Sequence, residues 1–183
     1  MPELLIGDDG WLLDARRCPS PNCNLRPDSD ISLVVIHGIS LPPGEFGGPY
    51  IEQLFTNTLR PEDHPYFATI YELQVSAHVL IRRDGALVQF VPFGMRAWHA
   101  GRSTFAGREN CNDYSIGIEL EGTDEIPYTD EQYVMLCAIL DALKRQFPAI
   151  GSRIAGHNQI APGRKTDPGP VFDWGRLAVV LSE

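Results

Sequence analysis

Long apolar runs are missing from this chain. No stretch reaches the roughly 18 apolar residues that a membrane-spanning helix needs. The first residues, MPELLIGDDGWLLDARR, lack the basic segment and long apolar core of a secretory signal, so we expect the protein to act in the cytoplasm. Internal repeats, low-complexity segments and interdomain linkers are also missing. A chain of 183 residues is long enough for one core, and we expect residues 1–183 to form a single domain.

Positive charge is scarce as well. Fifteen Lys and Arg residues against 24 Asp and Glu residues give a formal net charge of −9. Because non-specific binding to nucleic acid depends on neutralising phosphates, this balance disfavours a nucleic-acid partner. Local basic pairs such as Arg164 and Lys165 are still compatible with a small anionic ligand. We therefore expect a small-molecule substrate, no nucleic-acid or membrane partner, and a monomer.

Cysteine is present but not in the spacing of a metal or redox motif. The four residues form no CxxC pair, and no Cys/His pairing has zinc-finger spacing. In a cytoplasmic chain we expect all four to be reduced and structural. They are Cys18, Cys23, Cys111 and Cys137.

Four segments have the patterns of β-strands. Residues 32–37 (SLVVIH) are a β-branched run, typical of a strand buried on both faces. Residues 76–92 predict a hairpin that turns at Asp84 and Gly85. Residues 114–122 (YSIGIELEG) predict a strand with Glu119 and Glu121 on one face, and residues 153–157 predict a short one. The strands alone do not fix their order in a sheet.

Helices and an arm complete the predicted domain. Residues 128–148 predict the longest helix, opened by a capping box of Thr129 and Gln132, and residues 50–59 predict a short one. Asp173 can cap a last helix. Residues 1–31 predict a largely extended N-terminal arm, because residues 14–31 are polar and broken by prolines. Together these elements predict an α/β fold with a mixed central β-sheet flanked by helices.

Two histidines follow predicted strands. His37 ends one strand and His157 follows another, and groups at such strand ends often bind ligands, although a hydrogen-bonded core histidine is the more ordinary outcome. Asp167 could join them, and two imidazoles with one carboxylate are the ligand set of a catalytic zinc site. Spacing alone makes this a weak signal. Three other histidines compete as ligands, namely His64, His78 and His99.

A hydrolytic site also needs a base and a group that stabilises an oxyanion. Glu119 lies between apolar neighbours and could be the base, with Glu121 as its rival on the same face. Lys165 could stabilise a tetrahedral oxyanion, or it could be an ordinary solvated lysine. Trp98, in RAWHAG, could be a core residue or a platform on which a sugar stacks.

Several segments together resemble the cytoplasmic anhydro-N-acetylmuramoyl-L-alanine amidases of bacterial cell-wall recycling. They are LVVIHGISLPPGEFGGP, HPYF, VSAHVLIRRDGALVQFVPF, RAWHAGRS, CNDYSIGIELEGTD, YTDEQY and GHNQIAPGRKTDPGPVFDW. The resemblance runs from about Trp11 to Trp174, with the segments in matching order and spacing. The wider family includes phage amidase-type lysozymes and animal peptidoglycan recognition proteins, so the resemblance implies their fold.

The resemblance implies roles for individual residues. It implies one zinc ion with three ligands, which are His37, His157 and Asp167. It implies that Glu119 activates the attacking water and that Lys165 steadies the oxyanion. Tyr66, in HPYF, matches a family tyrosine near the metal, and Trp98 looks like part of the wall that receives the sugar.

The implied reaction is hydrolysis of the amide between the lactyl group of an anhydro-muramoyl sugar and L-alanine. Such fragments also signal to β-lactamase regulation in some bacteria. Three positions depart from the family pattern: Gly38 replaces an asparagine, and Gln74 and Asn110 replace arginines. These departures concern substrate binding. Two alternatives stay open at this point, an exported amidase that acts on intact peptidoglycan and a muropeptide-binding module without catalysis.

Overall fold

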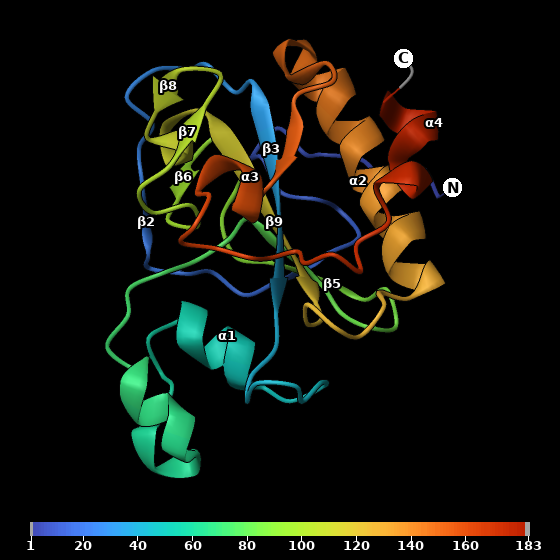
Figure 1. The fold of residues 1–183 in the computed structure, drawn as a ribbon. Coiled ribbons are helices and arrows are strands. Elements are labelled where there is room, and N and C mark those ends of the chain that lie inside the picture. Colours follow the sequence, from blue (N-terminus) through green and yellow to red (C-terminus); the bar gives the residue numbers. More distant parts are fainter. Residues whose placement is uncertain (1, 182–183) are drawn as a thin grey trace.

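The computed structural model describes residues 2–181, which form a mixed β-sheet with helices on both faces (Figure 1). The main sheet has six strands in the order β1-β5-β4-β9-β3-β10. Their bounds are β1 Arg16–Arg17, β5 Leu87–Gln89, β4 Val79–Ile81, β9 Ser115–Glu121, β3 Leu33–Ile39 and β10 Ile154–Gly156. Strands β4, β9, β3 and β10 are parallel, and β5 is antiparallel to β4. The carboxyl ends of four strands therefore meet at one edge.

The two longest strands are buried on both faces. Every residue of β9 is buried, and Leu33 to His37 of β3 are buried too. In β9, Ile116, Ile118 and Leu120 belong to the core that includes α2 (Asp130–Gln146). Ser115, Gly117 and Glu119 alternate with them and so point to the opposite face. The predicted common face of Glu119 and Glu121 follows from this alternation.

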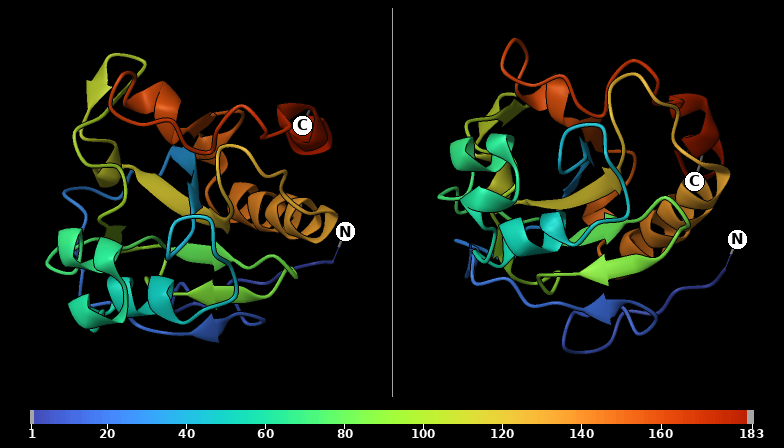
Figure 2. Two further views of the ribbon diagram at one scale, coloured as in Figure 1. Left: turned by 60° about the horizontal axis from the view of Figure 1, so that its bottom comes forward. Right: turned by 90° about the horizontal axis from the view of Figure 1, so that it is seen from below.

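Helix α2 begins with the predicted capping box. The amide of Gln132 donates to Thr129 Oγ1 (3.2 Å), and the amide of Thr129 donates to Gln132 Oε1 (3.0 Å). The helix covers one face of the sheet together with α4 (Ala178–Leu181), as Figure 2 shows. The predicted hairpin is also confirmed: β4 and β5 pair around Gly85, whose φ of 83° suits glycine.

The other face carries a second, smaller core. Helix α1 (Tyr50–Phe55) and the 3₁₀ turns η1 (Pro61–Asp63) and η2 (Pro65–Thr69) lie over it. Helix α1 ends at Phe55 rather than at Leu59, because Asn57 adopts a left-handed backbone with φ of 60°. Phe55 and Phe67 are buried against Leu80 and Phe90 of the hairpin. This lobe forms one wall of the site described below.

The N-terminal arm takes part in the sheet, which its polar sequence did not predict. Strand β1 pairs with β5 in parallel, and β2 (Cys23–Asn24) pairs with β6 (Arg96–Ala97). Figure 2 shows the arm passing along the β5 edge. Farther along the arm, the side chain of Arg26 donates to four backbone carbonyls. These belong to Phe93, Asn112, Asp113 and Ser115.

Short elements complete the described chain. They are β7 (Thr104–Phe105), β8 (Arg108–Glu109), α3 (His157–Ile160), and the 3₁₀ turns η3 (Cys111–Asp113), η4 (Pro148–Ile150) and η5 (Trp174–Leu177). Asp173 accepts from the amide of Gly175 and caps η5 as predicted. Within residues 2–181, no helix has the length and apolar character required to span a membrane.

Candidate active site

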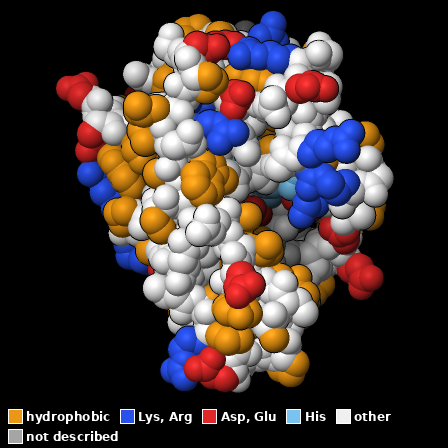
Figure 3. Space-filling model, turned by 90° about the vertical axis from the view of Figure 1, so that its left-hand side faces the viewer, with side chains coloured by type: hydrophobic (Ala, Val, Ile, Leu, Met, Phe, Trp, Pro, Cys, Tyr) orange, Lys and Arg blue, Asp and Glu red, His pale blue; other side chains and the backbone are white. Residues whose placement is uncertain are grey.

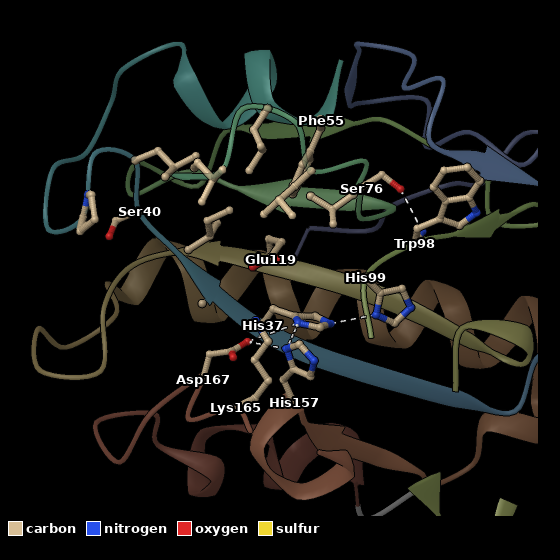
Figure 4. Close-up of a pocket in the computed structure, with 18 of the residues that line it drawn as sticks. His37, Ser40, Phe55, Ser76, Trp98, His99, Glu119, His157, Lys165 and Asp167 are labelled. Carbon is tan, nitrogen blue, oxygen red and sulfur yellow. Dashed lines mark hydrogen bonds and ion pairs between the residues drawn. The ribbon is translucent and has the colours of Figure 1, made fainter. Parts of the chain in front are cut away.

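The carboxyl ends of three parallel strands bring the predicted site residues together. His37 of β3 lies in register with Glu119 of β9. Gly156 of β10 pairs with Ile36, so His157, the next residue, lies beside the end of β3. The loop after α3 then returns to place Asp167 against both histidines (Figure 4). These groups line a cavity of about 340 Å³.

The two histidines and the aspartate form a tight cluster. His37 Nδ1 and His157 Nδ1 are 2.9 Å apart. Asp167 Oδ2 lies 3.3 Å from the first and 3.1 Å from the second. Both imidazoles are almost fully buried, and the Asp167 side chain is 17% exposed. One ligand atom from each residue therefore points to a common position at the floor of the cavity, an arrangement that could hold a metal ion.

The hydrogen bonds behind the cluster favour a cation in front of it. His157 Nε2 lies 3.1 Å from the carbonyl oxygen of Ala100, which can only accept, so this nitrogen carries the hydrogen. In a neutral ring, Nδ1 of His157 then carries a lone pair, and this lone pair faces the Asp167 carboxylate. Burial lowers the pKa of His37 to about 4, so its imidazole is neutral at neutral pH and one of its two ring nitrogens keeps a lone pair. A metal ion between these atoms fits the donor set.

Glu119 adds a buried carboxyl group beside the cluster. It is 8% exposed, and its Oε2 is buried with no hydrogen-bond partner among residues 2–181. Burial raises the pKa of Glu119 well above its usual range; the negative charge of Asp167 adds to the rise and the positive charge of Lys165 opposes it. Lys165 is exposed as a residue but lines the same cavity. A carboxylate in this state is suited to accept a proton.

Glu121, the rival on the same face, is engaged elsewhere. Its Oε1 accepts from Arg82 Nη1 (3.0 Å) and from the amide of Gly47 (2.6 Å), and its Oε2 accepts from the amide of Arg83 (3.3 Å). These bonds tie the loop after β3 to the sheet. The geometry therefore favours Glu119 over Glu121 as the base.

Trp98 and Tyr66 both line the cavity that holds the cluster. The indole Nε1 of Trp98 donates to Asn24 Oδ1 (2.7 Å), and its amide donates to Ser76 Oγ (3.0 Å). The Trp98 ring therefore lies at the edge of the cavity, tied to the N-terminal arm (Figure 4). Tyr66 is 41% exposed on η2. Both positions are accessible to a bound substrate.

The competing histidines lie outside the cluster. His64 caps η2, because its Nδ1 accepts from the amide of Tyr66. His78 is fully buried between the amide of Gly117 and the carbonyl oxygen of Met95. His99 is buried behind His37, with its Nδ1 2.9 Å from His37 Nε2. None of the three offers a nitrogen to the position that the cluster shares.

The residues that support the cluster lie in segments that carry the family resemblance, but the sequence did not predict their supporting roles. His99 contacts His37, and Ser115 Oγ lies 3.1 Å from His99 Nε2. Asn112 Oδ1 accepts from the amides of His99 and Ala100. Their spacing alone does not predict these contacts, because the contacts form only when the loop before β9 folds over that strand. Gly117 is the one hint, since a glycine inside a strand often marks a close approach.

The departures from the family pattern have different surroundings. The position of a Cβ on Gly38 lies 2.2 Å from the hydroxyl oxygen of Tyr128. That hydroxyl donates to the carbonyl oxygen of Pro168, next to Asp167, so the tyrosine uses the space that glycine leaves. Gln74 and Asn110 are both exposed, and Gln74 lines a smaller pocket beside the cavity. Substitution at these two positions leaves the cluster untouched.

Basic side chains gather beside the cavity. A space-filling view shows histidine side chains at the bottom of a hollow, with lysine and arginine side chains along one side (Figure 3). The side chain of Arg164 donates to the carbonyl oxygens of Ala100 and Arg102 and so is committed to the backbone. Arg83, which donates to the carbonyl oxygen of Pro127, and Arg108, which pairs with Asp30, line other pockets and not this cavity. Arg164 and Lys165 are the basic residues that lie next to the cluster.

Comparisons with known proteins agree with this geometry. The profile of the family described as N-acetylmuramoyl-L-alanine amidase matches residues 27–170. The 1,6-anhydro-N-acetylmuramyl-L-alanine amidase AmpD of Citrobacter freundii is 61% identical over 97% of this chain and 96% of its own. A crystal structure of an AmpD derivative superposes with a TM-score of 0.94 at 60% identity, covering 97% of this chain and 99% of the other.

A more distant structure matches as well. It is the amidase AmiD of Escherichia coli in complex with anhydro-N-acetylmuramic acid-L-Ala-D-γ-Glu-L-Lys. It matches with a TM-score of 0.59 and 28% identity, over 96% of this chain and 65% of that chain. The chain belongs to the N-acetylmuramoyl-L-alanine amidase family, and the predicted α/β fold with a mixed central sheet is confirmed.

Proposed function

We propose that the protein is a zinc-dependent amidase acting on soluble muropeptides. It cuts the amide between the lactyl group of 1,6-anhydro-N-acetylmuramic acid and L-alanine. The observation that carries this proposal is the cluster of His37, His157 and Asp167 beside the unpaired carboxylate of Glu119. The relatives named as 1,6-anhydro-N-acetylmuramyl-L-alanine amidases support this substrate. A monomer that works in the cytoplasm during cell-wall recycling is part of the proposal.

The cluster supports zinc as the metal. Two imidazole nitrogens and one carboxylate oxygen are the donors that catalytic zinc sites use. His37, His157 and Asp167 would hold the ion. When bound, zinc polarises the amide carbonyl and makes water easier to deprotonate.

Glu119 moves the proton that the reaction requires. Its Oε2 takes a proton from the attacking water while the water oxygen bonds to the amide carbon. The same carboxyl group then returns the proton to the amide nitrogen as the carbon–nitrogen bond breaks. The products are the lactyl carboxylic acid on the sugar, which loses its remaining proton at neutral pH, and the free amino group of L-alanine.

The other predicted residues act on charge and on substrate position. The Lys165 ammonium lines the cavity and offsets the negative charge that develops on the carbonyl oxygen. Trp98 and Tyr66 would contact the bound fragment from the walls.

Peptide release from anhydro-muramoyl-tripeptide tests the proposal. The purified protein should release the tripeptide, lose this activity when a chelator removes metal, and regain it with added zinc. No release, or release that persists without metal, would contradict the proposal. Equal activity on intact peptidoglycan sacculi would favour the exported amidase. Tight binding of the fragment without cleavage and without bound zinc would favour a binding module.

A further inference from the structure

The segment Trp98–Ala100 contacts both histidines of the cluster from behind. His37 Nε2 lies 2.9 Å from His99 Nδ1, and His157 Nε2 lies 3.1 Å from the carbonyl oxygen of Ala100. These are the ring nitrogens that face away from Asp167. The same three-residue segment therefore supports the two imidazoles whose Nδ1 atoms form the cluster.

The two contacts act on the imidazoles in different ways. The Ala100 carbonyl only accepts, so it selects the Nε2–H tautomer of His157 by itself. His99 can accept or donate, and its own partner is a serine hydroxyl, which can also do either. One arrangement suits ligation: His37 Nε2–H donates to His99 Nδ1, and His99 Nε2–H donates to Ser115 Oγ. This series of hydrogen bonds leaves a lone pair on His37 Nδ1, and the lone pair points toward Asp167.

The position of His99 is closely defined. Its ring lies over Gly117 of β9, where an added Cβ would be 2.4 Å from the ring carbon Cγ. Ser115, from the same face of β9, contacts the far nitrogen of the ring. The backbone is fixed too, since Asn112 Oδ1 accepts from the amides of His99 (3.1 Å) and Ala100 (2.8 Å). Asn112 is itself 7% exposed, so water competes little for these bonds.

We propose that the Trp98–Ala100 segment, held by Asn112, sets the tautomer and orientation of both histidines, with His99 as the positioning residue for His37. This inference rests on the proposed metal site, because its benefit is a pair of Nδ1 lone pairs already aimed at one ion. Partners behind metal-binding histidines commonly change metal affinity by about 10- to 100-fold when they are removed.

Substitutions at His99 test the inference through zinc affinity and tautomer state. His99→Leu removes the acceptor at similar volume and should weaken zinc binding about 10- to 100-fold in competition with a chromophoric chelator. His99→Asn is the matched variant, because its amide oxygen can occupy the place of Nδ1 and accept from His37. Its zinc affinity should stay within about threefold of the wild-type affinity, which is a much smaller change than the loss of the partner would cause.

Nuclear magnetic resonance of ¹⁵N-labelled histidines gives the second measurement. In the zinc-loaded wild-type protein, both His37 and His157 should carry hydrogen on Nε2. In His99→Leu, the Nε2–H signal of His37 should broaden or exchange away, whereas that of His157 should persist because Ala100 is unchanged. If His99→Leu keeps wild-type zinc affinity and both Nε2–H signals, the inference is wrong.

A variant at Asn112 covers the case in which His99→Leu fails to fold. Asn112→Ala removes the acceptor of both amides and should weaken zinc binding at least about tenfold while both Nε2–H signals broaden. Unchanged affinity and signals in this variant would also overturn the inference.

Failure of the proposed function can be told apart from failure of this inference. A wild-type protein that binds no zinc refutes the metal site, and one that binds zinc but cleaves nothing refutes only the reaction. The tautomers of the metal-free protein still report on the positioning role.

Discussion

Glu119 is a buried residue whose carboxyl group can carry a charge and has one oxygen without a hydrogen-bond partner among residues 2–181. Glu119→Gln removes the proposed proton acceptor and should lower kcat by about 10²- to 10⁴-fold. Because a neutral amide is less costly to bury than an unpaired carboxylate, thermal stability and zinc content should not fall. Steady-state peptide release and metal analysis check both parts, and loss of zinc would mean that Glu119 is a ligand instead.

The matched control is Glu121→Gln. Glu121 lies on the same face of β9, but its carboxylate is bound by Arg82 and by the amide of Gly47. The substitution should lower the unfolding free energy because Arg82 loses a charged partner, while kcat stays within a few-fold of the wild-type value. A large loss of turnover in this control would shift the proton-transfer role toward Glu121.

The lowered pKa of His78 predicts how the unfolding free energy responds to acid. Burial, together with the nearby charge of Arg26, lowers the pKa of His78 to about 3. The ring faces Arg26 Nη2 at 3.2 Å and the His99 ring at a centroid distance of 5.9 Å. In the unfolded chain the pKa returns to about 6.5, so between these values the unfolded state binds more protons. The unfolding free energy should therefore fall as the pH drops below about 6.5, by up to about 1.4 kcal/mol per pH unit from this residue.

The variant His78→Asn isolates this contribution. Its amide oxygen can still accept from Gly117, but the side chain no longer titrates. Urea unfolding at pH 7, 6 and 5 should give a shallower decline for the variant than for the wild-type protein. Parallel declines in the two proteins would show that His78 is not the residue that titrates.

The candidate site shows which functional residues can be predicted from the sequence alone. His37 and His157 could be singled out because each lies at the end of an apolar strand, and Asp167 could be added to them only as a weak signal until the family resemblance implied the same three ligands. Their convergence depends on the pairing of β3 with β10, a contact between segments more than a hundred positions apart that no local pattern encodes. His99 was a competing ligand in the sequence and proved to lie behind His37.

At the scale of elements, the start of helix α2 gives a further prediction. Thr129 Oγ1 accepts from the amide of Gln132 and also donates to the carbonyl oxygen of Arg83 (2.7 Å), which joins the helix to the hairpin. Thr129→Ala should lower the unfolding free energy by about 1–2 kcal/mol and leave kcat unchanged, because the cap lies away from the cluster. Thr129→Ser keeps the hydroxyl and should lose less than half as much in the same denaturation experiment. Equal losses in both variants would assign the effect to the methyl group.

Elements with a strong local pattern were predictable and those without one were not. Strand β3, the β4–β5 hairpin and helix α2 follow from apolar periodicity, turn residues and a capping box. Strand β1 is two exposed arginines, Arg16 and Arg17, whose place in the sheet depends only on pairing with β5. The strand order is likewise a matter of long-range pairing, so the composition of each strand could not fix it.

At the scale of the whole molecule, the N-terminal arm is anchored by one partly buried cation, Arg26. Arg26 donates to four backbone carbonyls on three segments, and burial lowers its pKa only to about 10, so it stays charged at neutral pH. Arg26→Met would leave these carbonyls unpaired and should lower the unfolding free energy by about 3 kcal/mol. Arg17→Met is the control: this exposed arginine forms an ion pair with Asp9 and lies over the Trp11 ring at 5.1 Å, and the loss of these two surface contacts should cost less than about 1 kcal/mol.

The same anchor connects the arm to the active site. Two of the carbonyls that Arg26 binds belong to Asn112 and Ser115, whose side chains hold the segment and the ring behind His37. Arg26→Met should therefore raise hydrogen exchange in residues 14–31 and also weaken zinc binding, although Arg26 touches none of the three ligands. Helix α2, packed on the opposite face, should keep its protection. If exchange rises equally in the arm and in α2, the variant has loosened the whole domain. If the arm loosens while zinc affinity holds, the arm does not brace the site.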